Sequence, residues 1–373
     1  MVFDPRTRRW FVFGYDQVRA LLDDERLTPD RMHRFADRAP AEAVEAVARD
    51  APWLISPQDA DFAWIRPIIQ AGLRSATAAG TRRAVAAAAD ELLRHAVRRE
   101  HFDVVAEYTL ALSGVMLADF LGVERREAAR LVGWGLDLAA FFNDVEITVE
   151  RARRMAHSTS EMVAWMQAAL AASHAVAAHG YLHRAGQAAA RHGRALDDET
   201  IANVTLPFLT GQIGTADLVS MTAYLLASHA DQRPASNSRL VPSAVAEALR
   251  HGSPVALVPR IALQAVTLGS RVIEPGDTVL LSLAAANRDP DRFPDPDRFD
   301  IGRAQAGSLG FGHGTHSCIA AGLARMQATA AVRALLQAAP DLALDPDGDV
   351  AWHEIAGVHS LRKLDVQAGV RSA

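Results

Sequence analysis

Cys318 and the residues just before it form the segment of this sequence with the clearest capacity for chemistry. Cys318 is the only cysteine in the 373-residue chain, and it ends the segment FGHGTHSC. The Ala-rich sequence from Cys318 to about Gln337 predicts a helix that begins near the sulfur. Gly312 and Gly314 let a backbone approach a flat group closely, and a helix N-terminus supplies N–H groups and a positive dipole end. This setting favours a thiolate, the form of cysteine that binds metal ions.

The same segment admits three other interpretations. An isolated cysteine is usually a small buried hydrophobe without reactivity. His313, His316 and Cys318 could instead bind zinc, but their spacing matches no closed structural site and no fourth ligand lies nearby in the sequence. Gly312-x-Gly314 is also similar to a nucleotide-binding glycine loop, yet the third glycine and the βαβ context are missing. The zinc and nucleotide interpretations are therefore disfavoured.

The rest of the chain must position this segment, and most of it is predicted to be helical. From about Ala41 to His229 the sequence is rich in Ala, Leu, Arg and Glu, and apolar residues recur at helical spacing. Two regions, RRWFVFG and VPRIALQAVTLGSRVIEPGDTVLLSLA, carry β-branched residues between Gly and Pro and predict strands. The expected fold is mainly α with small β-sheets, in a single domain over 1–373. Its helix-rich core spans about 41–252, and its β-rich part with the cysteine loop spans about 253–373.

Three motifs in a fixed order connect the cysteine segment to a known family. Glu247-Ala248-Leu249-Arg250 is an E-x-x-R helix, Pro296-Asp297-Arg298-Phe299 follows ANRDP, and FGHGTHSC precedes LAR. An E-x-x-R sequence alone carries little information, because i,i+3 ion pairs are common on helix surfaces. In this order the motifs resemble those of the cytochrome P450 family in its soluble bacterial form. The resemblance runs from about Trp10 to Val366.

The resemblance implies a haem b cofactor held by residues of this chain. Cys318 is then the axial thiolate ligand of the haem iron, and the thiolate helps to cleave an O–O bond. Arg260 and His316 are implied to bind the haem propionates. Arg66 is a further candidate, although Phe62 stands where relatives usually have a histidine. The full cofactor-binding set is Cys318, His316, Arg260, Arg66, Phe311, Gly312 and Gly314. Glu247, Arg250 and Arg298 are implied to form a buried network that holds the cysteine loop.

The long central helix departs from the family pattern. Relatives usually carry a small residue and Gly followed by any residue, an acid and Thr, whereas this chain has Thr210-Gly211-Gln212-Ile213-Gly214. Thr215 lies one position late, and one step along a helix turns a side chain by about 100°, so Thr215 is not a simple substitute. Gln212, a water beside Gly214 or a polar group of the substrate would have to supply protons. Alternatively, Ile213 and Gly214 only reshape the pocket. The candidate catalytic residues are Gln212, Ile213, Gly214 and Thr215, and the expected pocket residues are Leu209, Gln212, Ile213, Val255 and Ala256.

The implied activity is that of a haem-thiolate oxidoreductase, most simply a monooxygenase acting on a small or peptide-like molecule in specialised metabolism. Oxidative coupling, peroxide-driven oxidation and a catalytically silent haem-binding domain remain alternatives because the acid–alcohol pair is missing. Electrons are expected from a ferredoxin or flavodoxin that docks near Arg325. A net charge of −5 gives no general reason to bind nucleic acid. A single cysteine and the lack of a signal core or an apolar run of about 20 residues predict a cytoplasmic protein without a membrane anchor.

Overall fold

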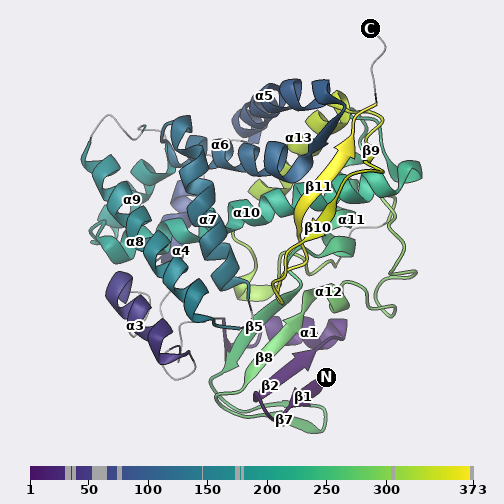
Figure 1. Cartoon of the computed structure of the whole chain (residues 1–373). Coiled ribbons are helices and arrows are strands. Elements are labelled where there is room, and N and C mark those ends of the chain that lie inside the picture. Colours follow the sequence, from purple (N-terminus) through teal and green to yellow (C-terminus); the bar gives the residue numbers. More distant parts are fainter. Residues whose placement is uncertain are drawn as a thin grey trace.

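The fold is organised around one long helix, α10 (Asp198–Ser228), which crosses the molecule in the computed structural model (Figure 1). The structure describes residues 1–29, 35, 39–52, 65–73, 78–144, 146–172, 177, 180–303 and 307–369. Helix α10 begins where the Asp197 carboxylate accepts a hydrogen bond from the Thr200 N–H over 2.9 Å, with Asp198 and Glu199 in the first turn. The predicted central helix is therefore confirmed as one continuous element.

Further helices pack around α10, as the predicted helical half of the chain requires. Those in contact with it are α4 (Ile65–Leu73), α6 (Leu110–Leu121), α7 (Ala128–Phe142), α8 (Val149–Ala171), α11 (Val241–Gly252) and α13 (Ala321–Ala338). The outer helices are α1 (Tyr15–Leu22), α3 (Ala41–Asp50), α5 (Ala78–Ala96), α9 (Tyr181–Arg191) and the short α12 (Leu283–Ala286). The short turns η2 (Val97–Arg99), η3 (Val104–Thr109), η4 (Arg125–Glu127), η5 (Ala230–Gln232) and η6 (Gly314–His316) complete the helical part of the described chain.

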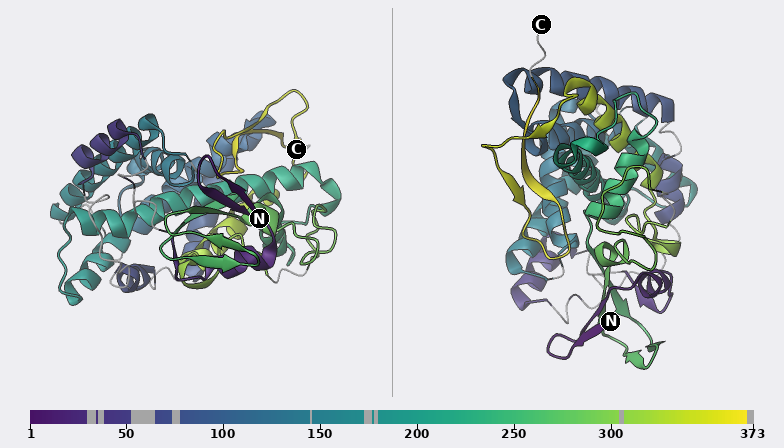
Figure 2. Two further views of the ribbon diagram at one scale, coloured as in Figure 1. Left: turned by 90° about the horizontal axis from the view of Figure 1, so that it is seen from below. Right: turned by 90° about the vertical axis from the view of Figure 1, so that its right-hand side faces the viewer.

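The main sheet lies at one end of the helical body, beside the N-terminus (Figures 1 and 2). Its strand order is β1-β2-β8-β5-β3, from β1 (Val2–Asp4), β2 (Arg9–Val12), β8 (Thr278–Ser282), β5 (Leu257–Ala262) and β3 (Leu27–Thr28). β2 runs parallel to β8, and β5 runs antiparallel to β8 with Arg260 opposite Val279. The strands expected in RRWFVFG and after Ser253 are confirmed, and the sheet fixes the position of Arg260.

Two smaller sheets complete the fold. β11 (Leu361–Gln367) pairs with β10 (Val350–Trp352), β4 (His101–Asp103) and β9 (Ala343–Leu344), and it packs beside α10. β6 (Val266–Leu268) and β7 (Arg271–Ile273) form a hairpin. The mainly α fold with small sheets is thus confirmed, while the single-domain organisation stays a prediction.

Within the described residues, one helical stretch, Val104–Leu121, has the length and apolar composition of a membrane span. It consists of η3 and α6, and 61% of it is buried inside the protein. Tyr108, Leu112 and Leu117 lie in the core with at most 4% of their surface exposed. The stretch therefore has the burial expected of a core helix.

Candidate active site

The cysteine loop is held in a defined shape by its own backbone. The Cys318 N–H donates to the Phe311 carbonyl over 2.8 Å, and the Ser317 N–H donates to the Gly314 carbonyl over 3.0 Å. Gly312 and Gly314 adopt φ values of +74° and +71°, a left-handed conformation that glycine reaches without strain. The helix after the loop begins at Ala321, so the expectation of a helix starting near Cys318 places its start about one turn too early. Cys318 stays outside the helix because its N–H already donates to the Phe311 carbonyl.

Contacts to α11 and α12 anchor this loop from behind. The Asn287 side chain accepts a hydrogen bond from the Leu309 N–H over 2.7 Å and donates to the Ser253 hydroxyl over 3.1 Å. At Gly310 a Cβ atom would lie 2.5 Å from Cγ of Leu249, so only glycine lets the loop pass this closely to α11. The loop and the E-x-x-R helix therefore form one packed unit.

A buried ion pair lies inside that unit. Arg250 donates from Nε and Nη2 to both carboxylate oxygens of Glu247, over 2.8 and 2.7 Å, and both side chains are at most 1% exposed. Its Nη1 also donates to the carbonyls of Asn287 and Pro296. A bidentate, fully hydrogen-bonded pair can stay ionised in the interior, whereas a lone charge cannot.

The prediction that the Arg298 side chain is the third member of this network is wrong. Arg298 is exposed, and only its carbonyl takes part, accepting from Arg250 over 3.2 Å. Arg303 supplies the second guanidinium, and its Nε donates to Glu247 Oε1 over 3.1 Å. The turn after PDRF brings Arg303 back over the ion pair, where it also donates to the carbonyls of Pro294, Asp295 and Arg298.

Two arginines and a histidine lie near one another beside the cysteine loop. Arg66 on α4 donates from Nη1 to the Thr315 carbonyl over 2.8 Å. Burial lowers the pKa of His316, and the positive charges of Arg260 and Arg66 lower it further. Arg260 is 7% exposed, its Nε has no hydrogen-bond partner among the described residues, and loss of water lowers the pKa of its guanidinium to about 10. A buried cation in this state fits an anionic ligand.

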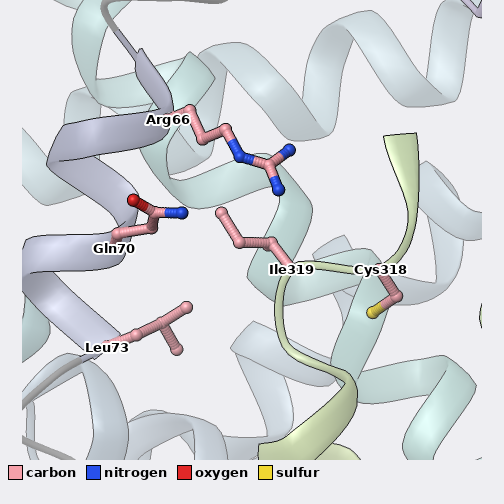
Figure 3. Close-up of a pocket in the computed structure, with 5 residues that line it drawn as sticks. All are labelled: Arg66, Gln70, Leu73, Cys318 and Ile319. Atoms are coloured by element: carbon pink, nitrogen blue, oxygen red, sulfur yellow. The ribbon is translucent and has the colours of Figure 1, made fainter. Parts of the chain in front are cut away.

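A cavity of about 450 Å³ opens between α4 and the cysteine loop. Arg66, Gln70 and Leu73 on α4 face Cys318 and Ile319 across it (Figure 3). Gln70, Leu73 and Ile319 were not expected from the sequence. The spacing i, i+4, i+7 from Arg66 places Gln70 and Leu73 on one helix face, so helical periodicity alone would have indicated them. Phe62, which stands in the family's usual histidine position, lies outside the described residues.

The Cys318 thiol itself is protonated more readily than the sequence suggests. The side chain is exposed at the cavity, but the surrounding protein desolvates the sulfur and raises the pKa of the thiol. A backbone N–H from Ala320 and the charge of Arg325 lower the pKa by less. Desolvation thus outweighs the N–H group and the cation, and the thiolate state of Cys318 stays a prediction. A thiolate here requires a cation such as a metal ion.

These features together fit a haem group. A sulfur ligand, a cavity beside it, a glycine-permitted backbone, the buried Arg260 and the exposed Arg66 and His316 occur together in this region. The two propionates of a haem would provide the anions that Arg260, Arg66 and His316 lack. Phe311 sits under Arg325, whose guanidinium carbon is 4.5 Å from the ring centroid, so the aromatic ring is held at the base of the loop.

Two of the residues predicted on the central helix lie against α7. Leu209 is fully buried, and Ile213 is 6% exposed and lies against α7, where Gly135 leaves room for it. Leu209 has no accessible surface, so its assignment to the pocket is wrong, whereas that of Ile213 stays a prediction. Gly211 and Gly214 have no atom within 4 Å of where a Cβ would lie, so the open face of α10 includes these glycines.

The remaining polar candidates on α10, Thr215 and Gln212, already take part in hydrogen bonds within the protein. The Thr215 hydroxyl donates to the Gly211 carbonyl over 3.0 Å, which agrees with the expectation that it does not replace the missing threonine. The Gln212 carbonyl accepts from the Ser113 hydroxyl over 3.1 Å, and its side chain is half-buried. Val255 and Ala256, before β5, are half-buried, and their role in the pocket stays a prediction.

Comparisons with known proteins agree with this geometry. The Cytochrome P450 family model matches residues 186–343. The chain is 30% identical over 370 residues to Cytochrome P450 107B1 of Saccharopolyspora erythraea, covering 96% of this chain and 89% of that protein. It is also 30% identical to the cytochrome P450 monooxygenase PikC of Streptomyces venezuelae, over 96% of this chain and 85% of PikC.

Similarity to solved structures extends over the whole fold. One solved structure superimposes on this chain with a TM-score of 0.85 at 26% identity. It comes from a study of unusual cytochrome P450-like monooxygenases involved in microbial secondary metabolism. The match covers 98% of this chain and 94% of that one. The chain belongs to the cytochrome P450 family, which confirms the fold, the enzyme class and the haem b cofactor inferred from its motifs.

Proposed function

We propose that this enzyme is a monooxygenase that oxidises a small or peptide-like organic molecule in specialised metabolism. The balanced reaction converts substrate, dioxygen, two electrons and two protons into hydroxylated product and water. Haem b supplies the oxygen activation when bound, while the protein sets access, orientation and proton supply. The similarity to PikC, a monooxygenase, supports this reaction type.

The observation that carries the proposal is that Cys318 and Arg66 line one cavity, while the buried Arg260, whose Nε has no hydrogen-bond partner among the described residues, lies close enough to His316 to lower its pKa. Cys318 would bind the iron through sulfur. Arg260, Arg66 and His316 would bind the propionates by charge-assisted hydrogen bonds. A protein that served only as a scaffold would have no use for a buried guanidinium whose Nε has no hydrogen-bond partner among the described residues, which argues against a catalytically silent domain.

Electrons would come from a separate ferredoxin or flavodoxin. Arg325 is exposed on the cysteine side and extends over Phe311, so an acidic partner surface could approach the loop there. We place the enzyme in the cytoplasm, without nucleic acid or membrane as a partner. Exchange of Arg325 for glutamate would slow ferredoxin-driven reduction and leave dithionite-driven reduction unchanged.

Oxidative coupling of aromatic groups is a second candidate, and the open space at Gly211 and Gly214 favours it. A large rigid substrate could lie against the bare helix backbone there. Coupling removes two hydrogens from the substrate, whereas hydroxylation adds one oxygen, so product mass separates the two. If every product gains an oxygen, coupling is excluded. Turnover driven by peroxide without a reductase would instead support the peroxide-using alternative.

The test of the proposal is spectroscopic and catalytic. The reduced holoenzyme treated with carbon monoxide should give the absorption band typical of thiolate-ligated haem, and Cys318→Ala should lose it. Amino acids, cyclic dipeptides, short peptides and polyketides should then be screened for shifts of the haem spectrum and for oxidised products. An unchanged carbon monoxide spectrum in Cys318→Ala would refute the ligand assignment.

A further inference from the structure

Asp217 is the only acidic residue between Thr210 and Ser228 in the sequence of the central helix. It follows Gly214 by three positions and Ile213 by four. On an α-helix these separations place Asp217 one turn further along the same face as both positions. It therefore lies beside the two positions where the family's acid and alcohol are missing.

The surroundings of Asp217 indicate an internal carboxyl group. Its neighbours Ala216 and Leu218 are only 4% and 2% exposed, while Asp217 keeps intermediate exposure. Helices α6, α7, α11 and α13 and strand β11 all pack against α10. Burial raises the pKa of Asp217 to about 7, and a hydrogen bond from the Ser360 hydroxyl lowers it by less. The Asp217 carboxyl is therefore desolvated by the surrounding protein although part of its side chain stays accessible.

Ser360 connects this carboxyl to the segment expected to line the pocket. Ser360 is 2% exposed and lies two residues after Val358, which forms a β-bridge with Val255. The Asp217 carboxyl therefore contacts the segment that the Val358 bridge joins to Val255. The nearby Thr215 hydroxyl is bonded to the Gly211 carbonyl, so it does not compete for the same role.

We propose that Asp217 is the internal proton donor of this enzyme and takes over from the missing acid–alcohol pair. The proposal rests on the monooxygenase function above, in which two protons accompany two electrons from the ferredoxin or flavodoxin. The O–H bond of the Asp217 carboxyl breaks, its proton passes directly or through one water to the oxygen atom that leaves as water, and the carboxylate regains a proton from solvent. Gly214 leaves room for that water beside the helix.

An infrared measurement tests whether Asp217 holds a proton, without requiring turnover. The holoenzyme at neutral pH should show the C=O stretch of a protonated carboxylic acid. Asp217→Asn should remove this band, and Ser360→Ala should shift it. Asp231→Asn is the matched control, because Asp231 is fully exposed just after the same helix, and it should leave the band unchanged. A band that persists in Asp217→Asn would overturn the proposal.

A kinetic comparison tests whether this proton is used. With NADPH, a ferredoxin reductase and a ferredoxin, oxygen reduction by Asp217→Asn should slow by about a hundredfold, with a larger solvent deuterium effect, as expected when a general acid is lost. Oxidation of a peroxidase dye by hydrogen peroxide, which brings its own protons, should be unaffected, and Asp231→Asn should match the unsubstituted enzyme in both assays.

Each outcome has a separate meaning. An active enzyme whose oxygen reduction is unchanged in Asp217→Asn, or which loses both reactions equally, excludes Asp217 as donor and leaves the monooxygenase proposal standing. If the unsubstituted holoenzyme reduces no oxygen, the monooxygenase proposal fails and the donor role fails with it, even where the infrared band is present.

Discussion

Arg303 donates from its Nε to Oε1 of Glu247 over 3.1 Å, although the two residues lie 56 positions apart in the chain. The same carboxylate is already paired with Arg250, so two guanidinium groups contact one buried carboxylate. This pair of contacts joins α11 to the segment that leads into the cysteine loop. Loss of the contacts should therefore disturb the haem site.

Arg303→Ala should lower the free energy of unfolding by about 2 to 3 kcal/mol, because it removes one partner of a buried ion pair together with hydrogen bonds to three carbonyls. Arg298→Ala is the matched control and should change stability by less than about 0.5 kcal/mol, since its side chain is exposed. Urea unfolding of the holoenzyme, followed by haem absorption, measures both. A larger effect from Arg298→Ala would show that the network has been misassigned.

Arg260→Gln should weaken haem retention by at least about tenfold. A hydrogen bond between a guanidinium and a carboxylate contributes roughly 1.5 to 3 kcal/mol, and each 1.4 kcal/mol corresponds to a factor of ten. Haem transfer to a scavenger apoprotein gives the rate. Arg271→Gln, on the exposed β6–β7 hairpin, should leave that rate unchanged. Equal rates for both variants would exclude Arg260 as a propionate ligand.

Asp217→Asn should stabilise the enzyme at high pH and make little difference in acid. The folded protein holds the Asp217 proton up to a pKa of about 7, whereas the unfolded chain loses it near the ordinary value of 3.8. Between these values the unfolded state binds fewer protons, so the stability contributed by protonated Asp217 falls as pH rises and stays low above pH 7. The variant should exceed the unsubstituted enzyme by about 2 to 3 kcal/mol at pH 8, less than the full shift allows because the side chain keeps some exposure. Denaturant midpoints from pH 5 to pH 8 check this, and a gap that narrows as pH rises would contradict it.

Two glycines should respond in opposite directions to the addition of one methyl group. Gly214→Ala should leave stability unchanged or raise it by about 0.5 to 1 kcal/mol, because the space beside it is open and alanine favours a helix. Gly310→Ala should lower stability by about 1 to 3 kcal/mol, since its Cβ would lie 2.5 Å from Leu249 Cγ. Thermal unfolding followed by haem absorption compares the two, and a destabilising Gly214→Ala would mean that the open face of α10 is filled.

The sequence predicts the elements and the local motifs better than it predicts which way side chains turn. Cys318, Arg260 and His316 could be proposed because their motifs resemble those of the family, and a resemblance of motifs needs only the sequence. Leu209 was misplaced because the rotation of α10 about its axis depends on its packing against Gly135 of α7. That packing is tertiary and leaves no local signal.

The error at Arg298 has a similar cause. PDRF places an arginine at the expected distance in the chain, but the following turn exposes that side chain and brings Arg303 to Glu247 instead. Asp217 was overlooked because an acid on a helix is usually solvated. Its significance depends on burial and on Ser360, which lies 143 positions later in the numbering.

The parallel pairing of β2 with β8 determines the order in which this protein can be assembled. Trp10 donates to the Asp277 carboxylate across 267 positions, and Val12 pairs with Leu281. During synthesis β1 and β2 can therefore join the main sheet only after β8 has emerged from the ribosome, because contacts between distant segments form late. β5, which carries Arg260, needs β8 as its neighbour, and Cys318 emerges later still. Haem can therefore join its binding site only when translation of this chain is almost finished.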